Sequence, residues 1–273
     1  MKADLNTISA ILVVKDEAAL IERCLKSLQG LVQEIIVVHD GPCSDTSLDI
    51  ARAYGAKILI GKFWGYMEPH LVPAYEQASG EWLLRIDADE FLSDDLRRAL
   101  PSLVSDSKIA AYEFNWPLFD GKKYLTKSWP EKICLFRKDK ISFVALPDAP
   151  TEVAGLIKRV DYTLEHRPLK DNYAFGVFKT RWLRLARMRA ELYAADFSIF
   201  PKFNSKSDDW TLRFRLRRRF PLLVLPFDCL IVFLRIVASG WHEGLIVIRV
   251  ALMTTALRAA IDWMMFKPVS YTH

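Results

Sequence analysis

Short apolar runs alternate with helical patterns between residues 8 and 86, and this alternation restricts the fold more than any other feature of the 273-residue chain. Ile8–Val14 is an apolar run of strand length, as expected of a strand covered on both faces. Segments with apolar residues at helical spacing separate it from the next runs, Glu34–Val38, Ala56–Ile60 and Trp82–Ile86. Strands and helices in this order predict parallel βαβ units with right-handed crossovers. We therefore expect an α/β domain with a mostly parallel sheet flanked by helices.

The helices between these strands are expected to begin at capping residues and to end at glycines. Asp16 and Ser44 are candidate N-caps, because their side chains can accept hydrogen bonds from a first helical turn. Gly30 and Gly55 follow the last apolar positions and predict the two helix ends. A third helix is expected over residues 71–78.

From residue 110 the pattern changes to shorter strands separated by Pro and Gly turns. Tyr112–Trp116, Lys132–Arg137 and Val160–Leu164 predict an antiparallel extension of the same sheet. Phe175–Tyr193 has helical periodicity, and an apolar tail begins at Phe220. We expect a catalytic domain over residues 1–175 and a basic, apolar helical region over residues 176–273.

The net charge of +5 conceals a segregation of charge along the chain. Residues 1–150 carry a net charge of −4, residues 151–178 are balanced, residues 179–219 carry +8, and residues 220–273 carry +1. An acidic front half followed by a basic segment indicates an anionic surface as partner, either a membrane or a nucleic acid.

The N-terminus and the cysteines indicate the cytoplasm. The first seven residues are short and polar, and the apolar run that follows is only of strand length, so no signal peptide is expected. The four cysteines have no CxxC spacing, which favours a reducing compartment and argues against a disulfide framework or a zinc knuckle. These cysteines are Cys24, Cys43, Cys134 and Cys229.

The acidic loop Asp87-Ala88-Asp89-Glu90 directly follows an expected buried strand. Ligands of open parallel sheets bind beyond the carboxyl ends of the strands. Two carboxylates at such a position can hold Mg²⁺, which binds through one or two carboxylates together with substrate phosphates. The alternative is the acidic first turn of a helix. The position of the loop favours a metal that neutralises a departing diphosphate.

Polar residues also follow the first two expected strands. Asp40, with His39 before it and the Gly41-Pro42 turn after it, can accept a hydrogen bond from a nucleobase or a ribose. Lys15-Asp16-Glu17 lies at the end of the first strand. For both loops the alternative is a plain turn with a helix cap.

Three segments with these motifs resemble the family 2 inverting glycosyltransferases of the GT-A fold, which has a Rossmann-like sheet. They are residues 11–17 (ILVVKDE), residues 35–46 (IIVVHDGPCSDT) and residues 81–90 (EWLLRIDADE). Weaker similarity around residues 135–166 resembles the branch that glycosylates lipopolysaccharide cores and other lipid-linked glycans. The sequence departs from the family pattern at Asp16, where Asn is usual, and at His39, where an Asp is usual.

The resemblance implies a nucleotide-sugar donor, with a UDP-sugar favoured, and Mg²⁺ or Mn²⁺ held by Asp87 and Asp89. It implies transfer of a single sugar with inversion, for which a carboxylate acts as general base. Glu152 and Asp148 are the candidates for that base, and His166 is a candidate contact for the acceptor or a phosphate. The residues expected to bind the donor are Lys15, Glu17, His39, Asp40, Glu68 and Asp87.

The tail is expected to contact a membrane surface. No uncharged run reaches 18 residues, which disfavours a simple transmembrane helix. Asp228, Arg235, Ser239 and His242 form a narrow polar stripe on an otherwise apolar helix, as in helices that lie in the interface. A basic cluster precedes this helix and can hold anionic lipid. Its residues are Arg213, Arg215, Arg217, Arg218 and Arg219.

Several alternatives remain for the tail and for the function. The tail could instead form a hairpin packed on the domain, or an oligomer interface. Nucleic-acid binding is disfavoured, since the basic cluster adjoins apolar sequence and the front half is acidic. The preferred function is a peripheral enzyme on the inner face of the membrane with a lipid-linked acceptor. The alternatives are a polyprenyl-phosphate sugar transferase, a nucleotidyltransferase and a non-catalytic nucleotide-binding or scaffold protein.

Overall fold

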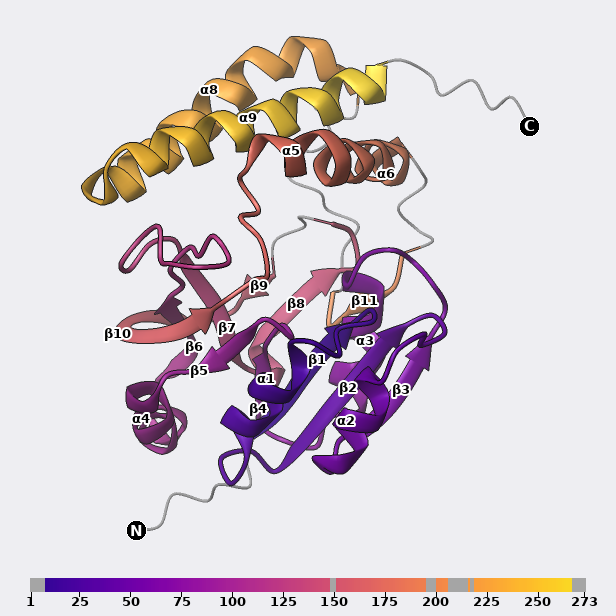
Figure 1. Ribbon diagram of the computed structural model, residues 1–273, viewed down its shortest axis with the longest axis vertical. Coiled ribbons are helices and arrows are strands. Elements are labelled where there is room, and N and C mark those ends of the chain that lie inside the picture. The colour runs from indigo at the N-terminus through magenta and orange to yellow at the C-terminus, as the bar shows by residue number, and fades with distance from the viewer. Residues whose placement is uncertain (1–7, 148–150, 195–199, 206–215, 217–218, 267–273) are drawn as a thin grey trace. The chain divides into compact units, whose positions relative to one another are not determined.

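The computed structural model describes residues 8–147, 151–194, 200–205, 216 and 219–266 (Figure 1). The chain divides into two compact units. The first unit contains Met1–Phe119, Ser128–Leu169 and Phe200–Ser205, and the second contains Asp120–Lys127, Lys170–Ile199 and Lys206–His273. The assignment of catalysis to residues 1–175 and of membrane binding to residues 176–273 stays a prediction.

An eight-stranded mixed sheet forms the centre of the first unit, with strand order β3-β2-β1-β4-β7-β6-β10-β5 in the described residues. The first four strands in this order run parallel, which confirms the expected βαβ units. The strands β7 and β5 are antiparallel to their neighbours. The strands are β1 (Ile8–Val14), β2 (Glu34–Asp40), β3 (Lys57–Gly61), β4 (Trp82–Arg85), β5 (Glu90–Leu92), β6 (Ile109–Asn115), β7 (Glu131–Arg137) and β10 (Leu156–His166).

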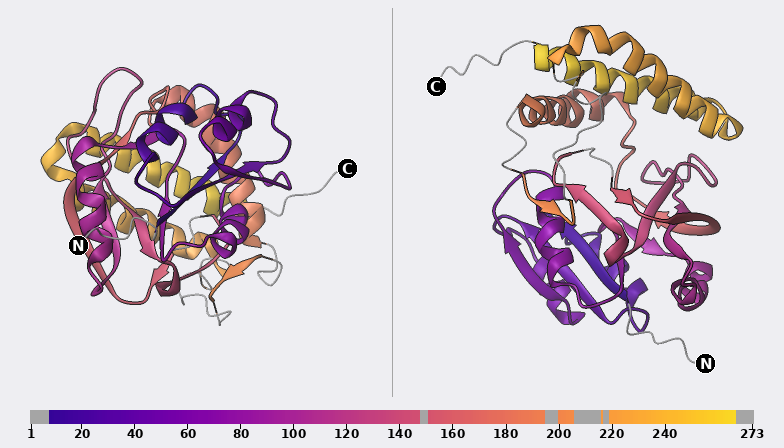
Figure 2. Two further views of the ribbon diagram at one scale, coloured as in Figure 1. Left: turned by 90° about the horizontal axis from the view of Figure 1, so that it is seen from below. Right: turned by 180° about the vertical axis from the view of Figure 1, so that it is seen from behind.

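Helices cover both faces of this sheet (Figures 1 and 2). On one face, Leu12 packs in a core with α1 (Ile21–Leu28), α2 (Ser47–Ala53) and α4 (Asp94–Ser105). On the other face, Ile11 packs in a core with α3 (Glu68–Gln77). Adjacent residues of β1 therefore point into different cores, as the pleat of a strand requires. A small second sheet joins the α3 face through β8 (Ile141–Val144), β9 (Glu152–Val153) and β11 (Lys202–Phe203).

The two expected helix caps are wrong. The helix α1 begins at Ile21, and Asp16 adopts a left-handed backbone with φ of 54°. The helix α2 begins at Ser47, while the backbone N–H of Ser44 donates to the Asp16 carboxylate at 2.7 Å. The Asp16 side chain therefore connects the loops after β1 and β2 through the Ser44 backbone. This connection needs contacts between distant residues, which a local pattern does not contain.

The helix α4 was not expected from the sequence. Ser93 caps it by accepting from the backbone N–H of Leu96 at 3.2 Å, and Asp94 and Asp95 lie in its first turn. An acidic helix start thus exists, but it lies after the Asp87–Glu90 loop. Glu90 itself begins the short strand β5.

The second unit is mainly helical in its described residues, apart from loops such as Asp120–Lys127. The expected helix over residues 175–193 is present as α5 (Phe175–Val177), a π-helical turn (Phe178–Trp182) and α6 (Leu183–Ala194). The apolar tail forms α8 (Pro221–Gly240), a 3₁₀ turn (Trp241–Glu243) and α9 (Leu245–Phe266), and α8 lies alongside α9 (Figure 1). Arg249 pairs with Asp171 at 2.9 Å, and the Lys127 backbone donates to Glu243 at 2.8 Å.

Much of α8 is apolar and exposed. The segment Leu222–Glu243 has a mean hydropathy of 2.2 and is long and apolar enough to cross a membrane, by length and composition only. The sequence disfavours a transmembrane helix when 18 uncharged residues in a row are required. This criterion misses the segment because Asp228 and Arg235 interrupt the run. Of the expected polar stripe, Arg235 and Ser239 are exposed but Asp228 is buried. The large apolar side chains of α8 that are exposed are Leu223, Phe227, Leu230, Ile231 and Leu234.

Two isoleucines on neighbouring strands test how far the sheet core stabilises the first unit. Ile36 on β2 is fully buried, whereas Ile60 on the edge strand β3 is 61% exposed. We expect Ile36→Ala to lower the free energy of unfolding by about 2–5 kcal/mol, because it leaves a cavity. Ile60→Ala should change it by no more than about 0.5 kcal/mol. Urea denaturation followed by circular dichroism measures both, and equal effects would contradict this description of the core.

Candidate active site

The loops that the sequence singled out all lie at one edge of the sheet. Since β2, β1 and β4 run parallel, their carboxyl ends lie at the same edge. The loop 15–17 follows β1, the loop 41–46 follows β2, and the loop 86–89 follows β4. Parallel strands therefore bring together residues that are far apart in the sequence, and they do so where open α/β sheets bind ligands.

Two carboxylates of the acidic loop after β4 form ion pairs with one lysine. The Asp87 backbone N–H donates to Glu90 Oε2 at 2.9 Å, and the Glu90 side chain is fully buried. Lys132 on β7 reaches both carboxylates, with Nζ 2.8 Å from Asp87 Oδ2 and 2.6 Å from Glu90 Oε1. The indole N–H of Trp116 also donates to Glu90 Oε1, at 2.5 Å. The carboxylates of Asp87 and Glu90 thus have a cation supplied by the chain itself.

Burial and the lysine act in opposite directions on these groups. Burial raises the pKa of Glu90. Burial also acts to raise the pKa of Asp87, but the Lys132 ammonium outweighs it, so that the pKa of Asp87 is lowered and the group stays ionised. For Lys132, burial acts to lower the pKa, and the Asp87 and Glu90 carboxylates outweigh it and raise the pKa.

Lys132 is a site residue that the sequence did not identify. Simple alternation along β7 would place it on the face opposite to Leu135. The ladder with β6 is irregular, however: Tyr112 pairs with Leu135, while the next residue pairs with Ile133. Cys134 is therefore the extra residue of a bulge, which brings Lys132 to the same face as Leu135. A lysine within an apolar strand was the only sequence signal.

Asp89 lies beside a buried histidine. Its Oδ2 is 3.4 Å from His166 Nε2, and its backbone carbonyl accepts from the N–H of Arg167 at 2.8 Å. The His166 ring stacks on Trp116 with centroids 3.8 Å apart. His166 Nδ1 is buried and has no hydrogen-bond partner in the described part of the chain. The Asp89 carboxylate and the Nε2 atom of His166 fit a divalent cation, since carboxylate and imidazole are both metal ligands in proteins.

A pocket of about 530 Å³ opens next to Asp87. Glu68, from the first turn of α3, lines it together with Arg85, Lys132 and Thr151. The structure therefore brings Glu68 and Asp87 to one pocket, as the predicted donor site requires. Glu152 follows Thr151 in β9, is exposed, and accepts from the Ser142 hydroxyl at 3.4 Å. Asp148 lies outside the described residues.

Asp40 is occupied by protein donors. Its carboxylate accepts from the backbone N–H groups of Trp64 and Gly65, at 2.6 and 2.9 Å, and lies 2.8 Å from His70 Nε2. The side chain is almost completely buried. Asp40 therefore anchors the loop that leads to Glu68, and its contact with a nucleobase stays a prediction.

The other residues predicted to bind the donor lie around Asp16. Lys15 Nζ donates to the Pro42 carbonyl at 2.7 Å and pairs with Asp16 at 3.0 Å. The hydrogen bond from the Ser44 backbone and the nearby Lys15 lower the pKa of Asp16 well below its ordinary value. The Glu17 backbone donates to Ser47 Oγ at 2.7 Å. His39 is buried and packs beside Asp16. Their roles toward a donor are untested.

Most of the basic cluster lies outside the described residues. Arg213, Arg215, Arg217 and Arg218 belong to that part of the chain. Arg219 is described and exposed, and its guanidinium lies 5.6 Å from the centroid of the Phe220 ring. The membrane contact of the cluster stays a prediction.

The sequence model of the glycosyl transferase family 2 matches residues 9–164, more than half of the chain. The chain belongs to this family. The mixed α/β architecture with its large central sheet matches the expected GT-A fold. The matched residues include the acidic loop Asp87–Glu90.

Two curated relatives cover a limited part of the chain. An uncharacterized glycosyltransferase of Rickettsia bellii (strain RML369-C) is 39% identical over 90 residues, which are 33% of this chain and 30% of that protein. The lipopolysaccharide core biosynthesis glycosyltransferase LpsC of Rhizobium meliloti (strain 1021) is 31% identical over 104 residues, 37% of this chain and 38% of that protein. The chain thus spans well under half the length of these relatives.

Among solved structures, glucosyl-3-phosphoglycerate synthase from Mycobacterium tuberculosis is similar, with a TM-score of 0.43 and 17% sequence identity. The similarity covers 69% of this chain and 78% of that one. That protein was crystallised with Mn²⁺, UDP and glucosyl-3-phosphoglycerate.

Removing the lysine should destabilise the acidic loop. We expect Lys132→Met to lower the free energy of unfolding by about 3–5 kcal/mol at neutral pH, because Asp87 and Glu90 lose their cation in a buried setting. The loss should shrink as the pH falls, since burial raises the pKa of Glu90 and the group then takes up a proton. Chemical denaturation at several pH values measures this. The control is Lys140→Met, which removes an exposed lysine; equal losses for both variants would refute the role of Lys132.

Proposed function

We propose that this family 2 glycosyltransferase moves a single sugar from a nucleotide-sugar donor, with a UDP-sugar favoured, to a lipid-linked glycan acceptor with inversion. The observation that carries the proposal is the acidic loop at the carboxyl ends of the parallel strands, beside a pocket of about 530 Å³. The match to the lipopolysaccharide core enzyme motivates the acceptor class. The pocket is of the size that small-molecule sites usually have.

We further propose that Asp89 and Asp87, together with His166, hold Mg²⁺ or Mn²⁺. The position of His166 Nε2, 3.4 Å from Asp89 Oδ2, supports this assignment. Such a cation would neutralise the charge that develops on the departing nucleoside diphosphate. Asp87 is already paired with Lys132, so Asp89 is the carboxylate of this loop on which metal binding should depend most.

The chain's own residues supply positioning and proton transfer in this proposal. Lys132 keeps Asp87 ionised and oriented toward the pocket. Glu68 accepts hydrogen bonds from hydroxyl groups of the donor sugar, since it lines the same pocket. Glu152, or Asp148, takes the proton from the acceptor hydroxyl as that oxygen attacks the anomeric carbon from the face opposite to the diphosphate.

A pair of variants separates donor binding from transfer. We expect Asp89→Asn to abolish Mn²⁺-dependent binding of UDP in calorimetry, whereas Asp94→Asn, in the first turn of α4, should bind as the unchanged protein does. Glu152→Gln should keep binding and lower transfer by about 10²–10⁴-fold, the usual effect of losing a general base. Normal transfer by Glu152→Gln would move the role of base to Asp148.

Incubation with a panel of nucleotide sugars, Mn²⁺ and membrane lipid extract distinguishes the alternatives. Release of nucleoside diphosphate with inverted product on a lipid-linked glycan supports the proposal. Transfer to polyprenyl phosphate itself would replace the acceptor, and release of pyrophosphate from a nucleoside triphosphate would indicate a nucleotidyltransferase. No reaction with any donor would favour a non-catalytic nucleotide-binding or scaffold protein.

We also propose that the second unit holds the enzyme on the cytoplasmic face of a membrane. The exposed apolar side chains of α8 and the preceding arginines support this placement. Each basic residue near an anionic leaflet contributes about 1 kcal/mol, and exposed apolar side chains add burial in the interface. Association of two copies through the tail is the alternative use of the same surface.

Sedimentation with anionic liposomes tests the membrane proposal. We expect replacement of the five arginines between Arg213 and Arg219 by glutamine to release the protein at moderate salt. Phe227→Ser should weaken sedimentation at all salt concentrations, because Phe227 is 70% exposed on α8. The matched control is Phe63→Ser, which alters a 58% exposed phenylalanine of the first unit. Unchanged sedimentation with a concentration-dependent dimer would favour the oligomer interface.

A further inference from the structure

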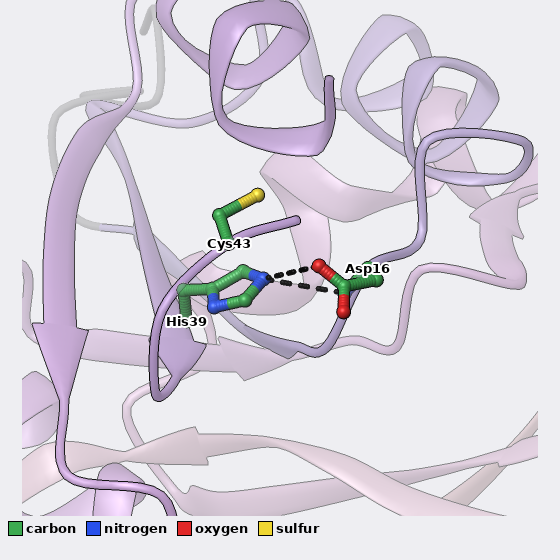
Figure 3. A group of neighbouring side chains, drawn as sticks. All are labelled: Asp16, His39 and Cys43. Carbon is green, nitrogen blue, oxygen red and sulfur yellow. Dashed lines mark hydrogen bonds and ion pairs between the residues drawn. The ribbon is translucent and has the colours of Figure 1, made fainter. Parts of the chain in front are cut away.

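Three different ligand types meet at the ends of β1 and β2. Asp16 lies in the loop after β1, His39 is the penultimate residue of β2, and Cys43 lies in the loop after β2 (Figure 3). One carboxylate oxygen, one ring nitrogen and the sulfur all lie within 4.8 Å of one another. His39 is fully buried, and the other two are half-buried.

The ring of His39 is held in one orientation and in one tautomer. His39 Nδ1 lies 2.7 Å from the carbonyl oxygen of Gly41, which can only accept, so Nδ1 carries the proton. The Asp16 backbone N–H donates to Nε2 at 3.2 Å, so Nε2 has a lone pair and no proton. A ligating histidine is held in the same way in metal sites, where the other ring N–H donates to a carbonyl or carboxylate.

This tautomer leaves two acceptors facing each other. His39 Nε2 lies 3.4 Å from Asp16 Oδ1, and neither atom has a proton to give to the other. Donation from the Ser44 backbone N–H, at 2.7 Å, keeps the Asp16 oxygen in place. Lone pairs that converge without a proton are satisfied by a cation. The bond from the Asp16 amide is at the long end of the usual range, so little is lost when a cation takes the Nε2 lone pair.

The ligand set and the spacing select the metal. Imidazole, thiolate and carboxylate together suit Zn²⁺, whereas Mg²⁺ and Mn²⁺ prefer oxygen ligands. Zinc bonds of about 2.0–2.3 Å at tetrahedral angles place ligand atoms about 3.3–3.7 Å apart. His39 Nε2 and Asp16 Oδ1 are already 3.4 Å apart, and the sulfur lies within 4.8 Å of its partners. The Cys43 thiol donates to the carbonyl and to Oδ1 of Asp45, at 3.3 and 3.5 Å, and gives up these contacts when it binds the metal.

We propose that Asp16, His39 and Cys43 form a binding site for Zn²⁺, with a fourth position open to water or to a ligand. The Cys43 thiol releases its proton as the metal binds. This site is separate from the one proposed at Asp89, and its existence does not depend on the proposed transferase activity. Lys15 opposes zinc binding, because its ammonium pairs with Asp16 Oδ2 at 3.0 Å.

Cobalt spectroscopy tests the site directly. The protein is stripped of metal with a chelator, kept reduced and titrated with Co²⁺, which reports tetrahedral thiolate coordination by a charge-transfer band and visible d–d bands. We expect one equivalent of Co²⁺ to give both signals and Zn²⁺ to remove them. The absence of a charge-transfer band in the unchanged protein would overturn the proposal.

Three variants test whether Cys43 and Asp16 take part in the site. Cys43→Ser should remove the charge-transfer band and weaken Zn²⁺ binding by more than the roughly 10–100-fold that loss of an outer-shell partner causes. Cys229→Ser, which changes the other half-buried cysteine, should keep the band. Lys15→Met should tighten Zn²⁺ binding several-fold, because it removes a competing charge from Asp16. If Cys43→Ser keeps the band while circular dichroism shows an intact fold, the site is not at Cys43 and the proposal fails.

Discussion

The ammonium group of Lys132 is the interaction on which the candidate active site depends. Burial makes a pair of carboxylates costly unless a cation is hydrogen-bonded to them, and Lys132 reaches Asp87 and Glu90 at once. With Trp116 donating to the same Glu90 oxygen, the loop is held both from β7 and from the residue that follows β6. Asp89 is thereby presented at the strand ends as the member of the loop that is not bound to Lys132.

A second brace acts on the other side of the pocket. Asp40 accepts two backbone N–H groups and lies within hydrogen-bonding distance of His70, which holds the chain between β3 and α3. Glu68 begins α3 just after this loop. Buried charged groups satisfied by the protein thus hold the two segments that bring Asp87 and Glu68 to the pocket.

The strands and the acidic loop could be predicted because each depends on local signals: an apolar run, a periodic segment, and carboxylates at a strand end. The position of Lys132 in the site could not be predicted, because the bulge at Cys134 interrupts the regular alternation of side chains between the two faces of β7. Asp40 was correctly placed at the strand end, but its partners come from a loop 24 residues later. Hydrogen bonds between residues far apart in the chain produce no periodic pattern in the sequence.

The lack of a side chain at Gly61 restricts which residues related sequences can carry around Asp40. A Cβ at position 61 would overlap the His70 ring, so that any larger residue there displaces the imidazole and removes a partner from Asp40. Positions 40, 61 and 70 are therefore expected to change together among related sequences. A homologue that carries a side chain at position 61 should also carry a different residue at position 70 and a different way of closing the loop above α3.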